Sequence, residues 1–168
     1  SQYKLVKTIA KLHERSFRML IDPIHPDPGL LERAAEVLRQ GGILAYPTET
    51  LYGLGVDPFR EKALEKLYLL KARPPTQPVS LLVRDMEMLE EVVRDLSPRA
   101  QRILETFLPG PLTAVLPARP HLAGLLTGGT EKIGIRISSH PLIPHLFALF
   151  PHPITTTSAN RSGMPPAT

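Results

Sequence analysis

Residues 27–56, DPGLLERAAEVLRQGGILAYPTETLYGLGV, contain the change from helix to strand that decides the fold class. Asp27 followed by Pro28 is typical of a helix start, because aspartate caps free backbone N–H groups and proline suits the first turn. Apolar residues recur at helical spacing as far as Leu38, and two glycines then end the predicted helix. The apolar run 43–46, bounded by glycine and proline, predicts a buried strand.

The same alternation continues toward the C-terminus. The predicted strands cover 51–56, 79–83, 112–116, 133–137 and 153–157, and the predicted helices cover 61–70, 86–93, 98–107 and 142–150. Strands separated by helices indicate an α/β sheet with at least some parallel pairing. Ligands of open α/β sheets bind where loops leave the strand ends, so the loops at 47–50, 71–77 and 158–163 are the first candidates for a site.

The first 20 residues are basic and carry few acids. Leu5, Ile9, Leu12 and Met19 recur at helical spacing among lysines and arginines. This pattern predicts a basic amphipathic helix that docks on the surface of the domain.

Composition narrows the class of protein. The chain has 168 residues, which fits one domain, and it has no cysteine, which excludes disulfide frameworks, thiolate nucleophiles and cysteine-ligated metal sites. No apolar run approaches the roughly 20 residues that cross a bilayer, so we expect no membrane association and a cytoplasmic location. The formal net charge of +4 suits an anionic ligand, either a phosphate-bearing small molecule or a nucleic acid.

Candidate binding groups lie at the ends of the predicted elements. Lys71 and Arg73 precede Pro74, and in an extended segment they would point the same way and grip neighbouring phosphate oxygens. The run 155–160, TTTSAN, places hydroxyls and an amide at the end of a predicted strand. Such groups can bind a phosphate, a ribose or an amino-acid head group.

Arg136 interrupts an apolar strand and therefore needs an acidic partner. A substrate carboxylate is one candidate, and Glu49 and Glu131 are the candidates within the chain. The sequence has no phosphate-binding P-loop, no complete dinucleotide fingerprint, no serine-nucleophile elbow and no H-E-x-x-H zinc motif.

Five motifs, in this order, resemble the YrdC-like domain of threonylcarbamoyl-AMP synthases. They are GGILAYPTETLYGLG at 41–55, KARP at 71–74, PGPLT at 109–113, IR with HP at 135–136 and 140–141, and TSAN with SG at 157–160 and 162–163. The resemblance implies a twisted, open, mixed α/β sheet with flanking helices and a large, positively charged concave pocket. It also implies a single YrdC-like domain over 1–168, with 1–26 as an N-terminal extension. The C-terminal end of the family domain, a later Ser-Thr-Val-Val-Asp strand and an Arg-Pro-Gly segment, is expected to be missing. The N-terminus and the run LLVRD at 81–85 also resemble the YciO branch.

The reaction implied by the resemblance joins L-threonine, bicarbonate and ATP into threonylcarbamoyl-adenylate, with release of pyrophosphate. ATP is then a substrate accompanied by Mg²⁺, which would bridge the phosphates and keep most of its waters, so no metal ligand is expected from protein side chains. The implied partners are the proteins that transfer the threonylcarbamoyl group to tRNA, and tRNA itself.

The resemblance also assigns roles to residues. Lys71, Arg73, Ser158 and Asn160 match the positions that bind the ATP phosphates and act in catalysis, and Gln77 matches a polar contact to the nucleotide. The positions that hold threonine are Thr50, Arg136 and Thr156, with Arg136 facing the substrate carboxylate. Leu82 stands where some family members have a histidine that touches threonine.

Two functions of other classes remain open. The basic charge would also suit a binding module for structured RNA without synthase activity, although an aromatic content of 5% argues against base stacking of single strands. A carbamoyl-transfer domain that uses carbamoyl phosphate in the same pocket is the third reading.

Overall fold

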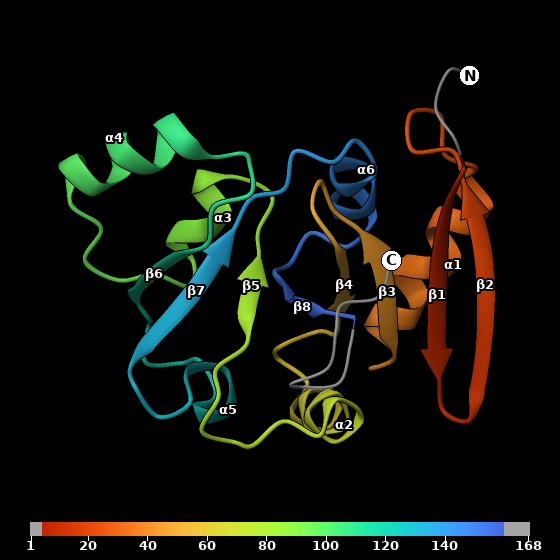
Figure 1. Ribbon diagram of the computed structural model, residues 1–168, viewed down its shortest axis with the longest axis horizontal. Coiled ribbons are helices and arrows are strands. Elements are labelled where there is room, and N and C mark those ends of the chain that lie inside the picture. Colours follow the sequence, from red (N-terminus) through yellow and green to blue (C-terminus); the bar gives the residue numbers. More distant parts are fainter. Residues whose placement is uncertain (1–4, 160–168) are drawn as a thin grey trace.

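The computed structural model describes residues 5–159, which form one mixed eight-stranded sheet in the order β2-β1-β3-β4-β8-β5-β7-β6 (Figure 1). The strands are β1 (Val6–Leu12), β2 (Arg15–Ile21), β3 (Ile43–Pro47), β4 (Tyr52–Gly55), β5 (Ser80–Leu82), β6 (Ala114–Pro117), β7 (Lys132–Arg136) and β8 (Ile154–Ser158). The pair β5–β7 is parallel and the other pairs are antiparallel. The predicted α/β sheet with some parallel pairing is therefore confirmed.

From residue 27 onward, the helices follow the predicted order with two differences. They are α1 (Pro28–Arg39), α2 (Glu61–Lys71), α3 (Met86–Glu90), α4 (Pro98–Phe107), α5 (Gly124–Thr127) and α6 (Leu142–Leu149). Helix α3 is shorter than predicted, and the single turn α5 was not predicted. None of the helices in residues 5–159 is long and apolar enough to span a bilayer.

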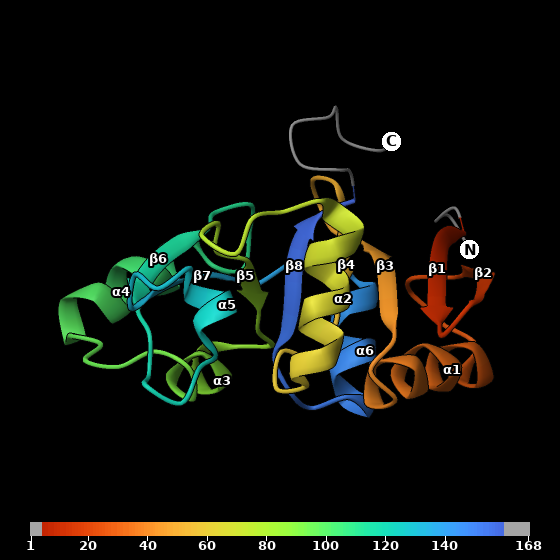
Figure 2. The ribbon, with the colours of Figure 1, turned by 90° about the horizontal axis from the view of Figure 1, so that it is seen from below.

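Helix α1 begins and ends as its sequence predicts. The Asp27 side chain accepts hydrogen bonds from Gly29 N at 2.8 Å and Leu30 N at 3.1 Å, which caps the first turn. The chain leaves the helix at Gly41, whose φ of 79° suits glycine. Helix α1 packs on β3 and on α6, and Figure 2 shows these two helices on the same side of the sheet.

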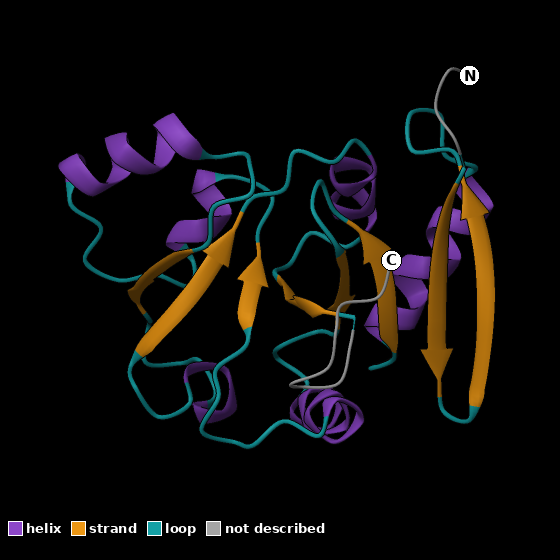
Figure 3. Cartoon of the chain, viewed as in Figure 1, coloured by secondary structure: helices purple, strands orange, loops and turns teal. Residues whose placement is uncertain are grey.

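The predicted N-terminal helix is wrong over the described residues, because β1 and β2 form an antiparallel hairpin there. Thr8 and Met19 pair across the hairpin and are buried, whereas Lys7 is exposed. Burial thus alternates with the strand period of two, and this outweighs the helical spacing of the leucines and isoleucine. The hairpin joins the sheet through β1 and β3, so the segment expected as an extension supplies one edge of the sheet (Figure 3).

Strand β8 joins the two halves of the sheet, because it pairs with β4 on one side and β5 on the other. Its fully buried Thr155 accepts a hydrogen bond from Val56 N at 2.9 Å and donates to Leu54 O at 3.3 Å. The Tyr46 hydroxyl donates to the carbonyl of Thr155 at 2.9 Å. These bonds fix the start of β8, so the polar residues at its other end have a defined position beside β4 and β5.

Candidate functional site

A cleft of about 140 Å³ lies at the end of β8, between β4, β5 and β7. Hydroxyl groups dominate its wall, and Arg136 is the cation among its lining residues, which are Thr50, Leu51, Tyr52, Gly53, Ser80, Thr113, Arg136, Thr156, Thr157 and Ser158. This volume is below the range of about 300–1,000 Å³ that holds drug-sized ligands. The cleft is therefore of a size for an amino acid rather than for a whole nucleotide.

The loop between β3 and β4 supplies Thr50 to the wall of this cleft, and Thr48 fixes the shape of the loop. The Thr48 hydroxyl donates to Leu51 O at 2.5 Å, and Leu51 N donates back to Thr48 Oγ1 at 3.2 Å. The hydroxyl oxygens of Thr48 and Thr50 lie 3.3 Å apart. A four-residue turn closed in this way holds the two intervening side chains in one orientation.

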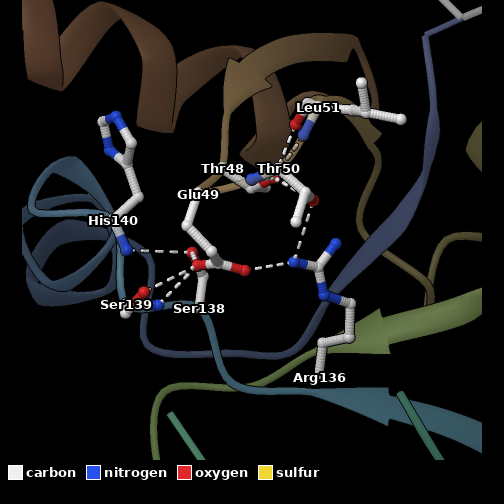
Figure 4. A network of polar contacts seen from close by, with 8 residues as sticks. All are labelled: Thr48, Glu49, Thr50, Leu51, Arg136, Ser138, Ser139 and His140. Atoms are coloured by element: carbon white, nitrogen blue, oxygen red, sulfur yellow. Dashed lines mark hydrogen bonds and ion pairs between the residues drawn. The ribbon is translucent and has the colours of Figure 1, made fainter. Parts of the chain in front are cut away.

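Glu49 is the partner of Arg136, as Figure 4 shows. Arg136 Nη2 donates to Glu49 Oε1 and also lies 3.4 Å from Thr50 Oγ1. The second carboxylate oxygen accepts from Ser138 Oγ at 2.6 Å, Ser139 N at 2.6 Å and Ser139 Oγ at 3.1 Å. Of the two acids of the chain named as candidates for Arg136, the structure selects Glu49.

The environment of Glu49 keeps its carboxylate ionised. Burial alone would raise its pKa, but the hydrogen bonds from Ser138 and Ser139 and the charge of Arg136 together lower the pKa to about 2. The Arg136 side chain is 14% exposed, and its Nε atom is buried without a hydrogen-bond partner among residues 5–159. Arg136 lines the cleft, and its Nη1 group makes no hydrogen bond to a described residue, so it is the donor that remains for a ligand there.

Lys71 is the last residue of α2 and is only 2% exposed, so its predicted place in an extended loop is wrong. The helix ends directly after it because Ala72 adopts a left-handed conformation, with φ of 51°. Lys71 Nζ donates to Thr157 Oγ1 at 2.9 Å and to Ser158 O at 2.6 Å, and it lies 3.5 Å from Ser158 Oγ. Within the described part of the chain no carboxylate lies within ion-pair distance of Lys71.

Burial, and after it the nearby charge of Arg73, lowers the pKa of Lys71 to about 8. A buried ammonium group that contacts only neutral oxygens has no counter-ion, and an anion bound in the adjacent cleft would neutralise its charge.

Arg73 does not point with Lys71, contrary to prediction. Its guanidinium donates to Pro78 O at 2.7 Å and more weakly to Gln77 O at 3.4 Å, whereas Lys71 contacts β8. Gln77 is exposed. Neither Arg73 nor Gln77 lines the 140 Å³ cleft.

The remaining predicted residues divide into two groups. Thr156, which is 7% exposed, and Ser158 line the cleft. Asn160 lies outside the described residues. The sequence did not indicate that Ser80 and Thr113 line the wall, nor that Ser138 and Ser139 hold Glu49. The position of Ser138 and Ser139 directly after the predicted strand 133–137 was an available signal. Among residues 5–159 no group of three or more His, Asp or Glu side chains could hold a metal ion.

Comparisons with known proteins agree with one another. The family model Sua5_yciO_yrdC, described as telomere recombination, matches residues 36–168. A threonylcarbamoyl-AMP synthase of Nitrosococcus oceani is 39% identical over 134 residues, which are 80% of this chain and 72% of the relative.

Solved structures show the same sheet. The crystal structure of P. abyssi Sua5 complexed with L-threonine matches with a TM-score of 0.81 and 33% identity, over 86% of this chain and 42% of that one. The crystal structure of E. coli YciO matches with a TM-score of 0.78 and 28% identity, over 86% of this chain and 70% of that one. The chain therefore spans less than half of the P. abyssi structure and most of the Nitrosococcus relative.

Proposed function

This chain belongs to the Sua5–YciO–YrdC family, and on that premise we propose that it is an enzyme that forms threonylcarbamoyl-AMP and pyrophosphate from L-threonine, bicarbonate and ATP. One observation carries the proposal. Thr50, Arg136 and Thr156 meet in a single cleft of amino-acid size, and the uncompensated ammonium of Lys71 lies against its edge. A hydroxyl-lined cleft with a guanidinium fits an amino acid, and a nearby free cation fits a phosphate.

Threonine occupies the cleft in this proposal. Its carboxylate binds the Arg136 guanidinium at the cleft wall, and the hydroxyls of Thr50 and Thr156 hold its polar atoms. A relative in the family has been solved in complex with L-threonine, which supports an amino-acid ligand of this kind.

ATP binds beside threonine, with its phosphates toward Lys71, Ser158, Arg73 and Asn160 and with Gln77 as a polar contact. Mg²⁺ enters with ATP as part of that substrate and is held mainly by phosphate oxygens and water. Because the cleft holds the amino acid alone, the nucleotide lies largely outside it.

The chemistry then proceeds in two bond changes. The threonine amino nitrogen bonds to the bicarbonate carbon with loss of water, which gives a carbamate. A carbamate oxygen attacks the α-phosphorus of ATP, the bond from that phosphorus to the bridging oxygen breaks, and pyrophosphate leaves. Both reactants are anions, so the cations lower the barrier by neutralising charge and by positioning.

The product is a reactive mixed anhydride, and we propose that partner proteins transfer its threonylcarbamoyl group to tRNA. The reaction would then take place in the cytoplasm, where tRNA and ATP are both available. An RNA-binding module without synthase activity is the second candidate, because the chain carries a net charge of +4.

Pyrophosphate release tests the proposal. The purified chain is given ATP and Mg²⁺, with L-threonine and bicarbonate each added and omitted. We expect release only when both are present. Absence of release, together with binding of structured RNA that weakens steeply as salt is raised, would support the RNA-binding module instead.

A further inference from the structure

Glu49 lies where the loop after β3 meets the end of β7, and the chain itself occupies both of its carboxylate oxygens (Figure 4). We propose that Glu49 is a positioning residue for the synthase reaction, which orients the Arg136 guanidinium so that its remaining donors can bind the carboxylate of the amino-acid substrate. This inference rests on the proposed function for its substrate, but the contact between the two residues can be tested without that function.

The geometry divides the donors of Arg136 into two sets. Nη2 is engaged by Glu49 and approaches Thr50, whereas the buried Nε has no partner among the described residues. Glu49 therefore fixes the Nη2 corner of the guanidinium, and Nη1, which makes no hydrogen bond to a described residue, remains for a ligand in the cleft that Arg136 lines. Two-pronged recognition of a carboxylate depends on the orientation of that planar group, and a free arginine side chain samples many rotamers.

Glu49 is itself held firmly enough to act in this way. Its side chain is 17% exposed, and Ser138 and Ser139 supply three hydrogen bonds to the oxygen that does not face Arg136. Glu49 Oε2 therefore holds the carboxylate against the loop after β7, and Oε1 holds Arg136. Ser138→Ala removes one hydrogen bond to Oε2 and leaves the contact between Oε1 and Arg136 in place.

Steady-state kinetics separate positioning from a structural role. Pyrophosphate release is measured with threonine and ATP varied in turn, for the wild type, Glu49→Ala, Glu49→Gln and Ser138→Ala. We expect Glu49→Ala to raise KM for threonine by about 10-fold or more, the size of a lost charged hydrogen bond, with KM for ATP within 2-fold. Glu49→Gln, which keeps an acceptor oxygen, should give a partial effect. Equal rises in both KM values, or none, would overturn the proposal.

A matched control is available on α1. Glu36 forms a half-buried pair with Arg39 away from the cleft, so Glu36→Gln removes one carboxylate of an ion pair without touching the site. It should leave both KM values unchanged. Thermal unfolding of each variant shows whether it is folded, and Glu49→Gln provides the test if Glu49→Ala does not fold.

The double variant tests whether Glu49 acts through Arg136. Arg136→Ala removes the guanidinium, so the further change Glu49→Ala should alter threonine affinity less than 2-fold in that background. If the double variant lowers threonine affinity by the product of the two single effects, Glu49 acts independently of Arg136, and the positioning role is wrong.

A measurement that needs no turnover keeps this inference separate from the proposed function. The ¹⁵Nε–¹Hε NMR signal of Arg136 reports how rigidly the guanidinium is held. We expect a sharp signal in the wild type that disappears in Glu49→Ala, broadens in Glu49→Gln and stays sharp in Glu36→Gln. An unchanged Arg136 signal would refute the positioning role, whereas a wild-type chain that releases no pyrophosphate would refute only the synthase.

Discussion

The ammonium of Lys71, at the end of α2, lies 2.9 Å from the hydroxyl oxygen of Thr157 in β8, and among residues 5–159 it donates only to neutral oxygens of that strand. This contact ties a helix to the central strand of the sheet at the edge of the cleft. It also leaves a buried positive charge with no carboxylate partner in residues 5–159, which is costly unless an anion binds nearby.

Lys71→Met should separate binding from stability. Methionine keeps the length of the side chain and removes the uncompensated charge, so we expect thermal stability to stay the same or rise. Catalytic efficiency toward ATP should fall by about 10- to 100-fold, in line with the loss of hydrogen bonds from a charged group. Lys62→Met, on the same helix but exposed, is the control. Normal kinetics in Lys71→Met would remove Lys71 from the phosphate site.

The pH dependence of ATP binding follows from the pKa of about 8 for Lys71. Below this pH the ammonium is charged and can attract phosphate, and above it the charge is lost. KM for ATP should therefore rise from about pH 8 upward, and Lys71→Arg, which stays charged, should remove this dependence.

The folded-state pKa of Lys71 is below the usual 10.5, so the unfolded chain binds more protons between about pH 8 and 10.5. The Lys71 contribution to stability should thus increase with pH over that window.

Glu49 gives a stability effect of the same sense in an acidic window, where stability again increases with pH. Its folded-state pKa of about 2 is below the usual 4.5, so its contribution to stability is complete above about pH 4.5 and declines as pH falls toward 2. The stability difference between wild type and Glu49→Gln, measured by denaturant unfolding, should therefore shrink across that window. A difference that does not depend on pH would mean that the ionised carboxylate is not what stabilises this loop.

The sequence predicted the order of the central elements because their signals are local. Asp27 and Pro28 start α1, and glycines end it, without help from the rest of the chain. The N-terminal hairpin was mispredicted because Leu5, Ile9, Leu12 and Met19 fit the helical period, although of these only Met19 reaches the core, together with Ala10 and Ile21. Pairing of β1 with β3 decides between these periods, and that pairing joins residues far apart in the sequence.

The sequence predicted which residues line the site better than it predicted the contacts between them. Thr50, Arg136, Thr156 and Ser158 were named and do line one cleft. The partner of Arg136 was left open between a substrate and two acids of the chain, because Glu49 lies 87 positions away and only the fold brings it near. Lys71 was placed in a loop because the following prolines signal one, but the helix continues until the left-handed Ala72.

Two buried threonines offer a matched test of what holds β8 in place. Thr155 is fully buried and its hydroxyl both accepts from Val56 N and donates to Leu54 O, whereas the buried hydroxyl of Thr8 has no partner in the described part of the chain. Thr155→Val leaves a backbone N–H unpaired and should lower the free energy of unfolding by about 1–3 kcal/mol. Thr8→Val removes a buried hydroxyl that makes no hydrogen bond to a described residue, and should leave the free energy of unfolding unchanged or raise it.

Denaturant unfolding of both variants gives the comparison. Equal decreases in the free energy of unfolding would show that the changed shape of the side chain, rather than the lost hydrogen bonds, destabilises the protein. Because the cleft residues Thr156 and Ser158 follow directly on Thr155 in β8, we also expect Thr155→Val to reduce pyrophosphate release, while Thr8→Val leaves it unchanged.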